Sequence, residues 1–196
     1  MSQTSFQFEE HQGVRVLRLE SDDGTNRLTH ACVVSLTEAL RGLRHEACPL
    51  VIAGSSRFFS VGANLAEIAT LNGPSAYDFS TLGQSLMAAI ENFPAPVCAA
   101  ISGYCLGGGL DLALACHWRI AAPNAIFGHR GAALGLITGW GGTQRLPRLI
   151  GKARALEMFV AAEKVGAAQA LRMGLIDRIA DAPIDEACRR VREIRC

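Results

Sequence analysis

One ionisable side chain stands in the most apolar segment of the chain, directly after a run of glycines. Asp111 follows the run Gly107, Gly108 and Gly109 by two residues, and residues 112–116 are all apolar. Glycines at the start of a helix cost backbone entropy, and this cost is usual where another group approaches the backbone closely. The free N–H groups of a helix N-terminus favour negative charge. We therefore expect this segment to hold a group that carries or develops negative charge.

The glycine run could also have a purely structural role, and it matches none of three common catalytic or cofactor-binding motifs. The glycines could serve only to let a strand and a helix pack tightly, with Asp111 interacting only with the helix dipole. The run lacks the G-x-G-x-x-G pattern of dinucleotide sites and the G-K-[ST] of a phosphate-binding loop. It also lacks the G-x-S-x-G turn that presents a catalytic serine. The pattern thus favours neither a nucleotide cofactor nor a serine nucleophile.

Composition limits the classes of function. The chain has 196 residues, a formal net charge of +1 and 49% apolar residues, which suits one domain with a sizeable core. Near neutrality argues against nucleic-acid or membrane-surface binding through bulk charge. No apolar run approaches the ~20 residues of a membrane helix. The seven scattered cysteines form no C-x-x-C pair, so we predict no metal site and a reduced, cytoplasmic protein.

Strands and helices must position these residues. Val97–Ile101 and Leu50–Ala53 are short apolar runs typical of buried strands. Thr29 is a suitable N-cap for a helix that follows it, and Ala63 is expected to begin a short helix after a polar loop. Residues 128–142 form a long glycine-rich loop, and loops of that length usually serve a function. The alternation of strands and helices predicts an α/β domain with parallel crossovers.

Three ordered segments carry a family resemblance. Residues 96–116, read P-V-C-A-A-I-S-G-Y-C-L-G-G-G-L-D-L-A-L-A-C, resemble the signature of the crotonase superfamily, the enoyl-CoA hydratase/isomerase group. Residues 57–65, R-F-F-S-V-G-A-N-L, resemble its F-S-x-G-A-D-L loop, and residues 127–148 resemble its third block. The match covers nearly the whole chain, from about residue 14 to residue 179.

The resemblance implies a fold and an assembly. It implies an α/β spiral of repeated ββα units, with an acyl-CoA-binding core over residues 1–182 and a C-terminal helix over residues 183–196. Most relatives continue through further C-terminal helices, which this sequence does not contain, so we expect a shortened C-terminal helical region. The resemblance also implies a homotrimer or a dimer of trimers.

The resemblance implies a substrate and an oxyanion hole. In the family, two backbone N–H groups stabilise the enolate of a CoA thioester, and the matching residues here are Ala63 and Gly108. Coenzyme A would enter as part of the substrate, with no tightly bound cofactor. Main-chain groups near Gly24, Val61, Ala63 and Leu65 would hold its adenine and pantetheine parts, and Gly107 and Gly108 are further expected contacts. The loop residue Arg57 could pair with a CoA phosphate, although a solvated side chain is the simpler interpretation.

The acid–base residues depart from the family pattern. Family hydratases use two carboxylates, and Asp111 stands at the first position, while Gly131 stands at the second. His129 could be a substitute base, or it could be bonded within its loop. Relatives with glycine at the second position include enzymes that use bicarbonate, and Arg130 could balance such an anion. If the site excludes water, the pKa of Asp111 should rise toward a useful acid–base value.

Two classes of function therefore remain open. The first is an acyl-CoA enzyme that forms a thioester enolate, with hydration or isomerisation of an enoyl-CoA as the commonest family outcome. Decarboxylation, thioester hydrolysis and bicarbonate-assisted chemistry are alternatives that use the same oxyanion hole. The second class is a non-catalytic acyl-CoA-binding subunit, which the missing second carboxylate at Gly131 motivates.

Overall fold

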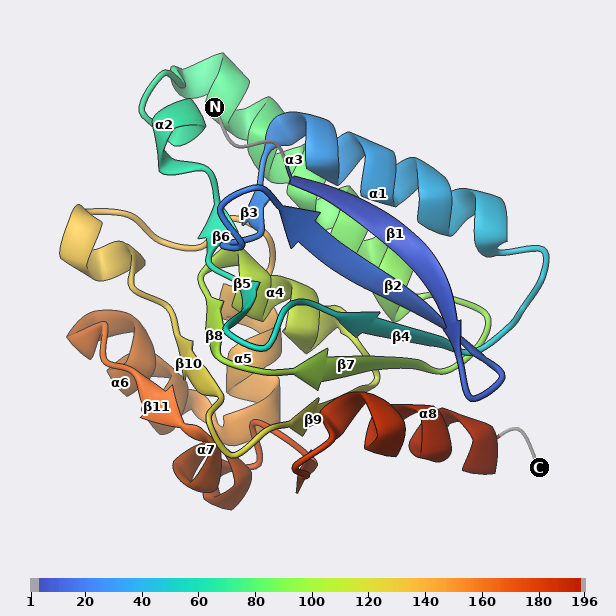
Figure 1. The fold of residues 1–196 in the computed structure, drawn as a ribbon. Coiled ribbons are helices and arrows are strands. Elements are labelled where there is room, and N and C mark those ends of the chain that lie inside the picture. Colours follow the sequence, from blue (N-terminus) through green and yellow to red (C-terminus); the bar gives the residue numbers. More distant parts are fainter. Residues whose placement is uncertain (1–3, 195–196) are drawn as a thin grey trace.

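A six-stranded sheet forms the centre of the protein. The computed structural model describes residues 4–194 and is shown in Figure 1. The strand order is β1-β2-β4-β7-β9-β12, antiparallel between β1 and β2 and parallel from β2 onward. The strands are β1 (Thr4–His11), β2 (Val14–Ser21), β4 (Leu50–Ala53), β7 (Val97–Ile101), β9 (Trp118–Ala121) and β12 (Arg178–Ile179).

A second sheet has four strands, and three of them follow one by one after the central strands β4, β7 and β9 of the first sheet. Its order is β11-β10-β8-β5, with β5, β8 and β10 parallel and β11 antiparallel to β10. Three successive units therefore place one strand in each sheet and then a helix, namely β4-β5-α3, β7-β8-α4 and β9-β10-α5. This confirms the predicted α/β spiral of ββα units. The strands are β5 (Phe58–Ser60), β8 (Tyr104–Leu106), β10 (Ile126–Gly128) and β11 (Val165–Gly166), and a separate pair is formed by β3 (Arg27–Leu28) and β6 (Gly62–Ala63).

Local sequence signals explain where the helices begin. Thr29 caps α1 by accepting a hydrogen bond from Cys32 N at 3.2 Å, as its type predicts. Ala63 does not begin a helix, because it pairs with Leu28 in the β3–β6 ladder, and Asn64 caps the helix that follows. The helices are α1 (His30–Leu43), α2 (Leu65–Ile68), α3 (Gly73–Glu91), α4 (Gly108–Ala115), the 3₁₀ turn η1 (Gly131–Leu134), α5 (Gly142–Ile150), α6 (Lys152–Ala161), α7 (Ala167–Met173) and α8 (Pro183–Glu193).

Alternate residues of the central strands enter two separate apolar cores. On β4, Leu50 and Ile52 pack into the larger core, which includes buried residues of α1, α3 and α4. Val51 and Ala53 face the other way and pack with buried residues of α8. Successive side chains of a strand point to opposite faces, so the sheet is covered on both sides. Figure 1 shows α1 and α3 on one side of the strands and α8 on the other.

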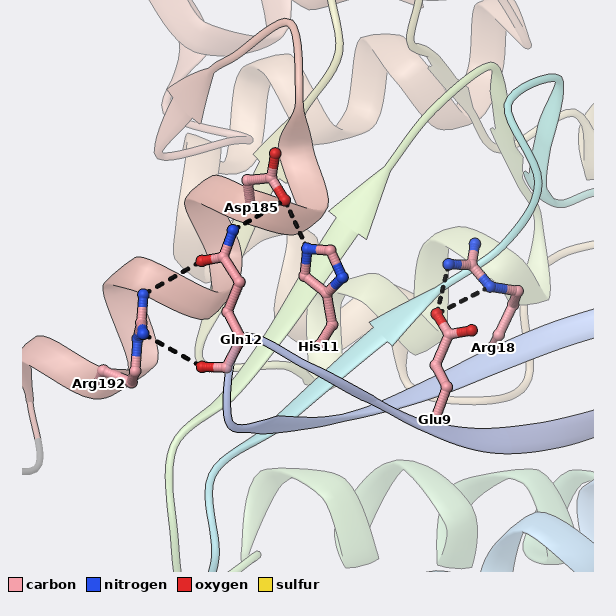
Figure 2. Close-up of polar contacts among 6 residues, drawn as sticks. All are labelled: Glu9, His11, Gln12, Arg18, Asp185 and Arg192. Atoms are coloured by element: carbon pink, nitrogen blue, oxygen red, sulfur yellow. Dashed lines mark hydrogen bonds and ion pairs between the residues drawn. The ribbon is translucent and has the colours of Figure 1, made fainter.

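Polar contacts attach α8 to the β1–β2 hairpin. The hairpin turns at Gln12 and Gly13, whose φ values of 50° and 73° are typical of a two-residue type I′ turn. Asp185 of α8 lies 2.5 Å from His11 Nε2 and accepts a hydrogen bond from Gln12 Nε2 at 3.3 Å. Arg192 donates to the backbone oxygen of Gln12 at 3.1 Å. Figure 2 shows these side chains converging between the turn and the helix.

Residues 4–194 contain neither a membrane-spanning helix nor a cluster of metal ligands. None of the helices in this range combines the length and apolar character needed to cross a membrane. The same residues contain no group of three or more His, Cys, Asp or Glu side chains that could hold a metal ion.

Candidate active site

A cavity of about 480 Å³ opens between α2, α3, α4 and the loop that contains η1. Its wall is mainly apolar, and exposed apolar side chains lie around its mouth, including Leu65, Leu134 and Ile137. An apolar cavity with few polar groups is the usual form of a small-molecule site. The wall also contains glycines and polar side chains, namely Gly107, Gly108, Asp111, Ser80, His129, Arg130, Gly131, Thr138 and Gly139.

The amide of Ala63 and the start of α4 meet on the cavity wall. A Cβ built on Gly108 would lie 3.3 Å from Ala63 N, and one built on Gly62 would lie 2.6 Å from Gly108 N. Asn64 N donates to Leu28 O in β3 at 3.3 Å. Since the next amide bonds to β3, Ala63 N–H is expected to point to the other edge of β6. Gly108 is the first residue of α4, where the amide has no partner within the helix.

Glycine is required on both sides of this contact. Gly62 has a φ of 91°, and a side chain there would collide with the amide of Gly108. A Cβ on Gly108 itself would lie 2.6 Å from the Trp140 ring. Gly107, the N-cap residue, has a φ of 52° and donates to Gly128 O at 2.9 Å. The glycine cost predicted from the sequence therefore corresponds to a close approach of two backbone segments.

Asp111 lies one turn into α4 and is only 1% exposed. Its Oδ2 accepts a hydrogen bond from the Thr138 hydroxyl, while its Oδ1 has no hydrogen-bond partner. Burial raises the pKa of Asp111 to about 7, and the Thr138 hydrogen bond and the charge of Arg145 limit the rise. This direction agrees with the rise expected for a site that excludes water.

His129 comes from the loop after β10 and faces the same carboxylate. The imidazole is 3% exposed, and its Nε2 lies 3.5 Å from Asp111 Oδ1 without a hydrogen bond. Its ring lies 5.1 Å from that of Phe159, measured between centroids. Burial lowers the pKa of His129 to about 4, so the imidazole is neutral at pH 7. The structure thus places the candidate base beside the candidate acid.

Gly131 leaves no room for a side chain where the family pattern has a second carboxylate. It lines the cavity as the first residue of η1. A Cβ there would lie 2.7 Å from the backbone oxygen of Leu136, which folds back over it. A carboxylate at this position would require the loop to take another path.

Not all of the residues expected to contact coenzyme A lie on the wall of the cavity. Val61, Ala63 and Leu65 line the cavity. Gly24 does not line it, because it lies in the turn after β2, where its amide bonds to Ser21 O at 2.8 Å. That turn still adjoins the loop, since Val61 N donates to the backbone oxygen of the next residue, Thr25, at 3.1 Å.

Two further loop residues shape the site and were not predicted. Thr138 bonds to Asp111, and the Trp140 indole donates to Phe79 O at 3.2 Å. Gly83 makes room for the indole, because a Cβ there would lie 2.1 Å from its ring. The sequence offered two signals for these contacts: Gly83 within the long helix α3, and the hydroxyl of Thr138 in an apolar loop. Neither signal identifies the residue that it contacts.

The arrangement of two sheets, the ββα units and the glycine-lined cavity defines a crotonase-like α/β protein. The chain belongs to the enoyl-CoA hydratase/isomerase family, whose model matches residues 9–194. It is 36% identical over 174 residues to a crotonyl-CoA hydratase of Syntrophomonas wolfei, covering 87% of this chain and 67% of the relative. It is 49% identical over 130 residues to a probable enoyl-CoA hydratase of Bacillus subtilis, covering 65% of this chain and 50% of that relative.

Solved structures agree with this assignment. An enoyl-CoA hydratase from Bacillus anthracis matches with a TM-score of 0.90 and 32% identity, covering 96% of this chain and 76% of that one. DspI of Pseudomonas aeruginosa matches with a TM-score of 0.90 and 30% identity, covering 96% of this chain and 74% of that one. The chain therefore spans half to three quarters of the proteins that it resembles.

Proposed function

We propose that the protein is an enzyme that binds an acyl-CoA thioester and stabilises its enolate. The observation that carries the proposal is the approach of Gly108 to the amide of Ala63 on the wall of an apolar cavity. Two N–H groups at this place would donate to the thioester oxygen as negative charge develops on it. Losing one such donor typically costs on the order of 100- to 1000-fold in rate.

Asp111 is the acid–base group of the proposal. A pKa of about 7 leaves both the acid and the carboxylate populated near neutral pH, which suits a group that gives and takes a proton. The coenzyme A portion would pass Val61, Leu65 and Gly107 at the cavity mouth, with Gly24 at the outer turn. It enters with the substrate, and the proposal requires no tightly bound cofactor.

The proposed setting is a homotrimer or a dimer of trimers in the cytoplasm, without nucleic-acid or membrane partners. Six cysteines of the described residues are free thiols, which fits a reducing compartment. Analytical ultracentrifugation tests the assembly, and a monomer at micromolar concentration would contradict it.

The Asp111→Asn variant tests catalysis against simple binding. Turnover of a panel of enoyl-CoA thioesters is followed by mass spectrometry, and CoA affinity is measured by calorimetry. We expect the variant to lose turnover by about 100-fold or more while CoA affinity stays nearly unchanged. The matched control is Asp181→Asn, which changes an exposed aspartate away from the cavity. A wild-type protein that binds CoA thioesters tightly and converts none would instead indicate a non-catalytic subunit.

A further inference from the structure

Two buried polar atoms face each other at the cavity without hydrogen bonds. Within residues 4–194, four buried side-chain polar atoms have no hydrogen-bond partner, and Asp111 Oδ1 and His129 Nε2 are two of these four. They lie 3.5 Å apart on different elements, and both residues line the cavity. Buried polar groups are nearly always hydrogen-bonded, so two unpaired polar atoms that face each other are suited to share one polar ligand.

The geometry and charge of the pair suit a water molecule. Atoms 3.5 Å apart can both reach one oxygen atom at ordinary hydrogen-bond lengths of about 2.8 Å. Burial favours the uncharged form of each group, so the pair offers one O–H donor and one nitrogen acceptor. A neutral ligand that both accepts and donates fits this pair better than an anion does. A buried water usually makes two to four such bonds.

Neighbouring residues fix the orientation of the pair. The Thr138 hydroxyl occupies Asp111 Oδ2, so Oδ1 is the oxygen left for a ligand. The Cα of Gly142 is pressed against both groups, because a Cβ there would lie 2.2 Å from Asp111 Oδ1 and 3.0 Å from His129 Cε1. The room for a second carboxylate is closed at Gly131 by the backbone of Leu136. The imidazole is therefore the only nitrogen base of the described residues placed within reach of Asp111 Oδ1 on this wall.

We propose that His129 and Asp111 together hold the water that adds to an α,β-unsaturated acyl thioester, and that His129 Nε2 is the base that activates it. This inference rests on the proposed function and specifies its reaction as hydration. His129 would then supply the role left open by the glycine at residue 131.

The reaction balances with water as the only co-reactant. One O–H bond of water breaks, its proton moves to His129 Nε2, and its oxygen bonds to the β-carbon. The π electrons of the double bond move into the thioester, where the Ala63 and Gly108 amides hold the enolate. The Asp111 O–H bond then breaks and its proton bonds to the α-carbon. After the product leaves, a new water that bridges the two groups accepts the imidazolium proton and donates one of its own protons to the Asp111 carboxylate 3.5 Å away, which restores the starting state.

Two reactions separate the role of His129 from that of Asp111. Hydration of crotonyl-CoA needs both groups and is followed by loss of the enoyl-thioester absorbance. Exchange of the α-protons of butyryl-CoA in deuterated water needs only the amides and Asp111, and is followed by mass spectrometry. In His129→Gln, we expect hydration to fall by about 100-fold or more and exchange to stay within about threefold. Asp111→Asn should lose both reactions.

Imidazole rescue and the wild-type pH profile extend the test beyond a single variant. His129→Ala opens space in the cavity, so added imidazole should restore hydration at least tenfold. His129 lies 3.5 Å from Asp111, and Arg145 of α5 and the Cys105 thiol of β8 interact with Asp111 electrostatically. With these neighbours, wild-type hydration should fall as the pH rises through about 7, and exchange should rise over the same range. His45→Gln, at an exposed position outside the cavity, is the matched control.

The possible outcomes distinguish the two levels of the proposal. Hydration that survives in His129→Gln within threefold, or that requires added bicarbonate in the wild type, would overturn the role of His129. Wild-type exchange without hydration would also overturn it and leave the enolate site standing. A wild-type protein that shows neither reaction would remove the proposed function and this inference with it.

Discussion

The Thr138 hydroxyl limits the rise that burial causes in the pKa of Asp111, and Thr138→Val tests this. The hydroxyl donates to Asp111 Oδ2 and stabilises the charged carboxylate more than the neutral acid. A hydrogen bond to a charged group contributes about 1.5–3 kcal/mol, and one pH unit corresponds to about 1.36 kcal/mol. Removing the bond should therefore move the titration of Asp111 upward by about 1–2 pH units, because valine keeps the shape and removes only the donor.

Two measurements check this shift. The carboxyl ¹³C resonance of Asp111 gives its titration directly, with a wild-type midpoint of about 7. For the proposed hydration of crotonyl-CoA, the pH profile should give the same midpoint, and its falling limb should move with the resonance. Thr81→Val, on the exposed side of α3, is the matched control and should leave both midpoints in place. A midpoint that stays constant or moves downward in Thr138→Val, in a folded protein, would refute the assigned role of the hydroxyl.

Three further perturbations follow from the same contacts. Between pH 4 and 7 folded Asp111 keeps a proton that the unfolded chain has lost. The buried carboxylate therefore lowers the free energy of unfolding by up to about 4 kcal/mol above pH 7. Asp111→Asn should raise the urea midpoint at pH 8 and change it little at pH 4, and a variant that is destabilised at pH 8 would contradict this. Gly142→Ala places a methyl group 2.2 Å from Asp111 Oδ1, so turnover should fall about 100-fold with CoA binding retained, and an unchanged rate would count against the geometry. Asn64→Ala should lower the free energy of unfolding by about 1 kcal/mol, because the N-cap of α2 is lost. Asn64→Asp should leave that free energy nearly unchanged, and equal losses in the two variants would show that capping is not the role of Asn64.

The N-cap hydrogen bond of Asn64 also explains a departure from the family sequence. Asparagine stands at residue 64 where the family pattern has aspartate. Asn64 accepts a hydrogen bond from Ala66 N at 3.1 Å, and both residue types cap helices about equally well. The change is therefore conservative for structure, which the sequence did not reveal.

Local patterns predicted most elements and missed those defined by pairing. The apolar runs at Leu50–Ala53 and Val97–Ile101 are central strands, and Thr29 caps its helix, as predicted. The strand Tyr104–Leu106 was missed because it is short and stands between glycines. Residue 63 was expected to begin a helix, but pairing with β3 holds it in a strand. Such short strands are set by a partner far along the chain and have little local signal.

The sequence by itself determined the family, the ββα order of the elements and the presence of one acidic residue behind three glycines. These are properties of neighbouring residues and of motifs, which can be recognised before the chain is folded. Only the tertiary structure decided that Thr138, 27 residues from Asp111, bonds to its carboxylate, and that His129 faces the other oxygen. The pKa of Asp111 likewise depends on burial by side chains from several elements, because desolvation is a property of the folded surroundings and not of the residue type.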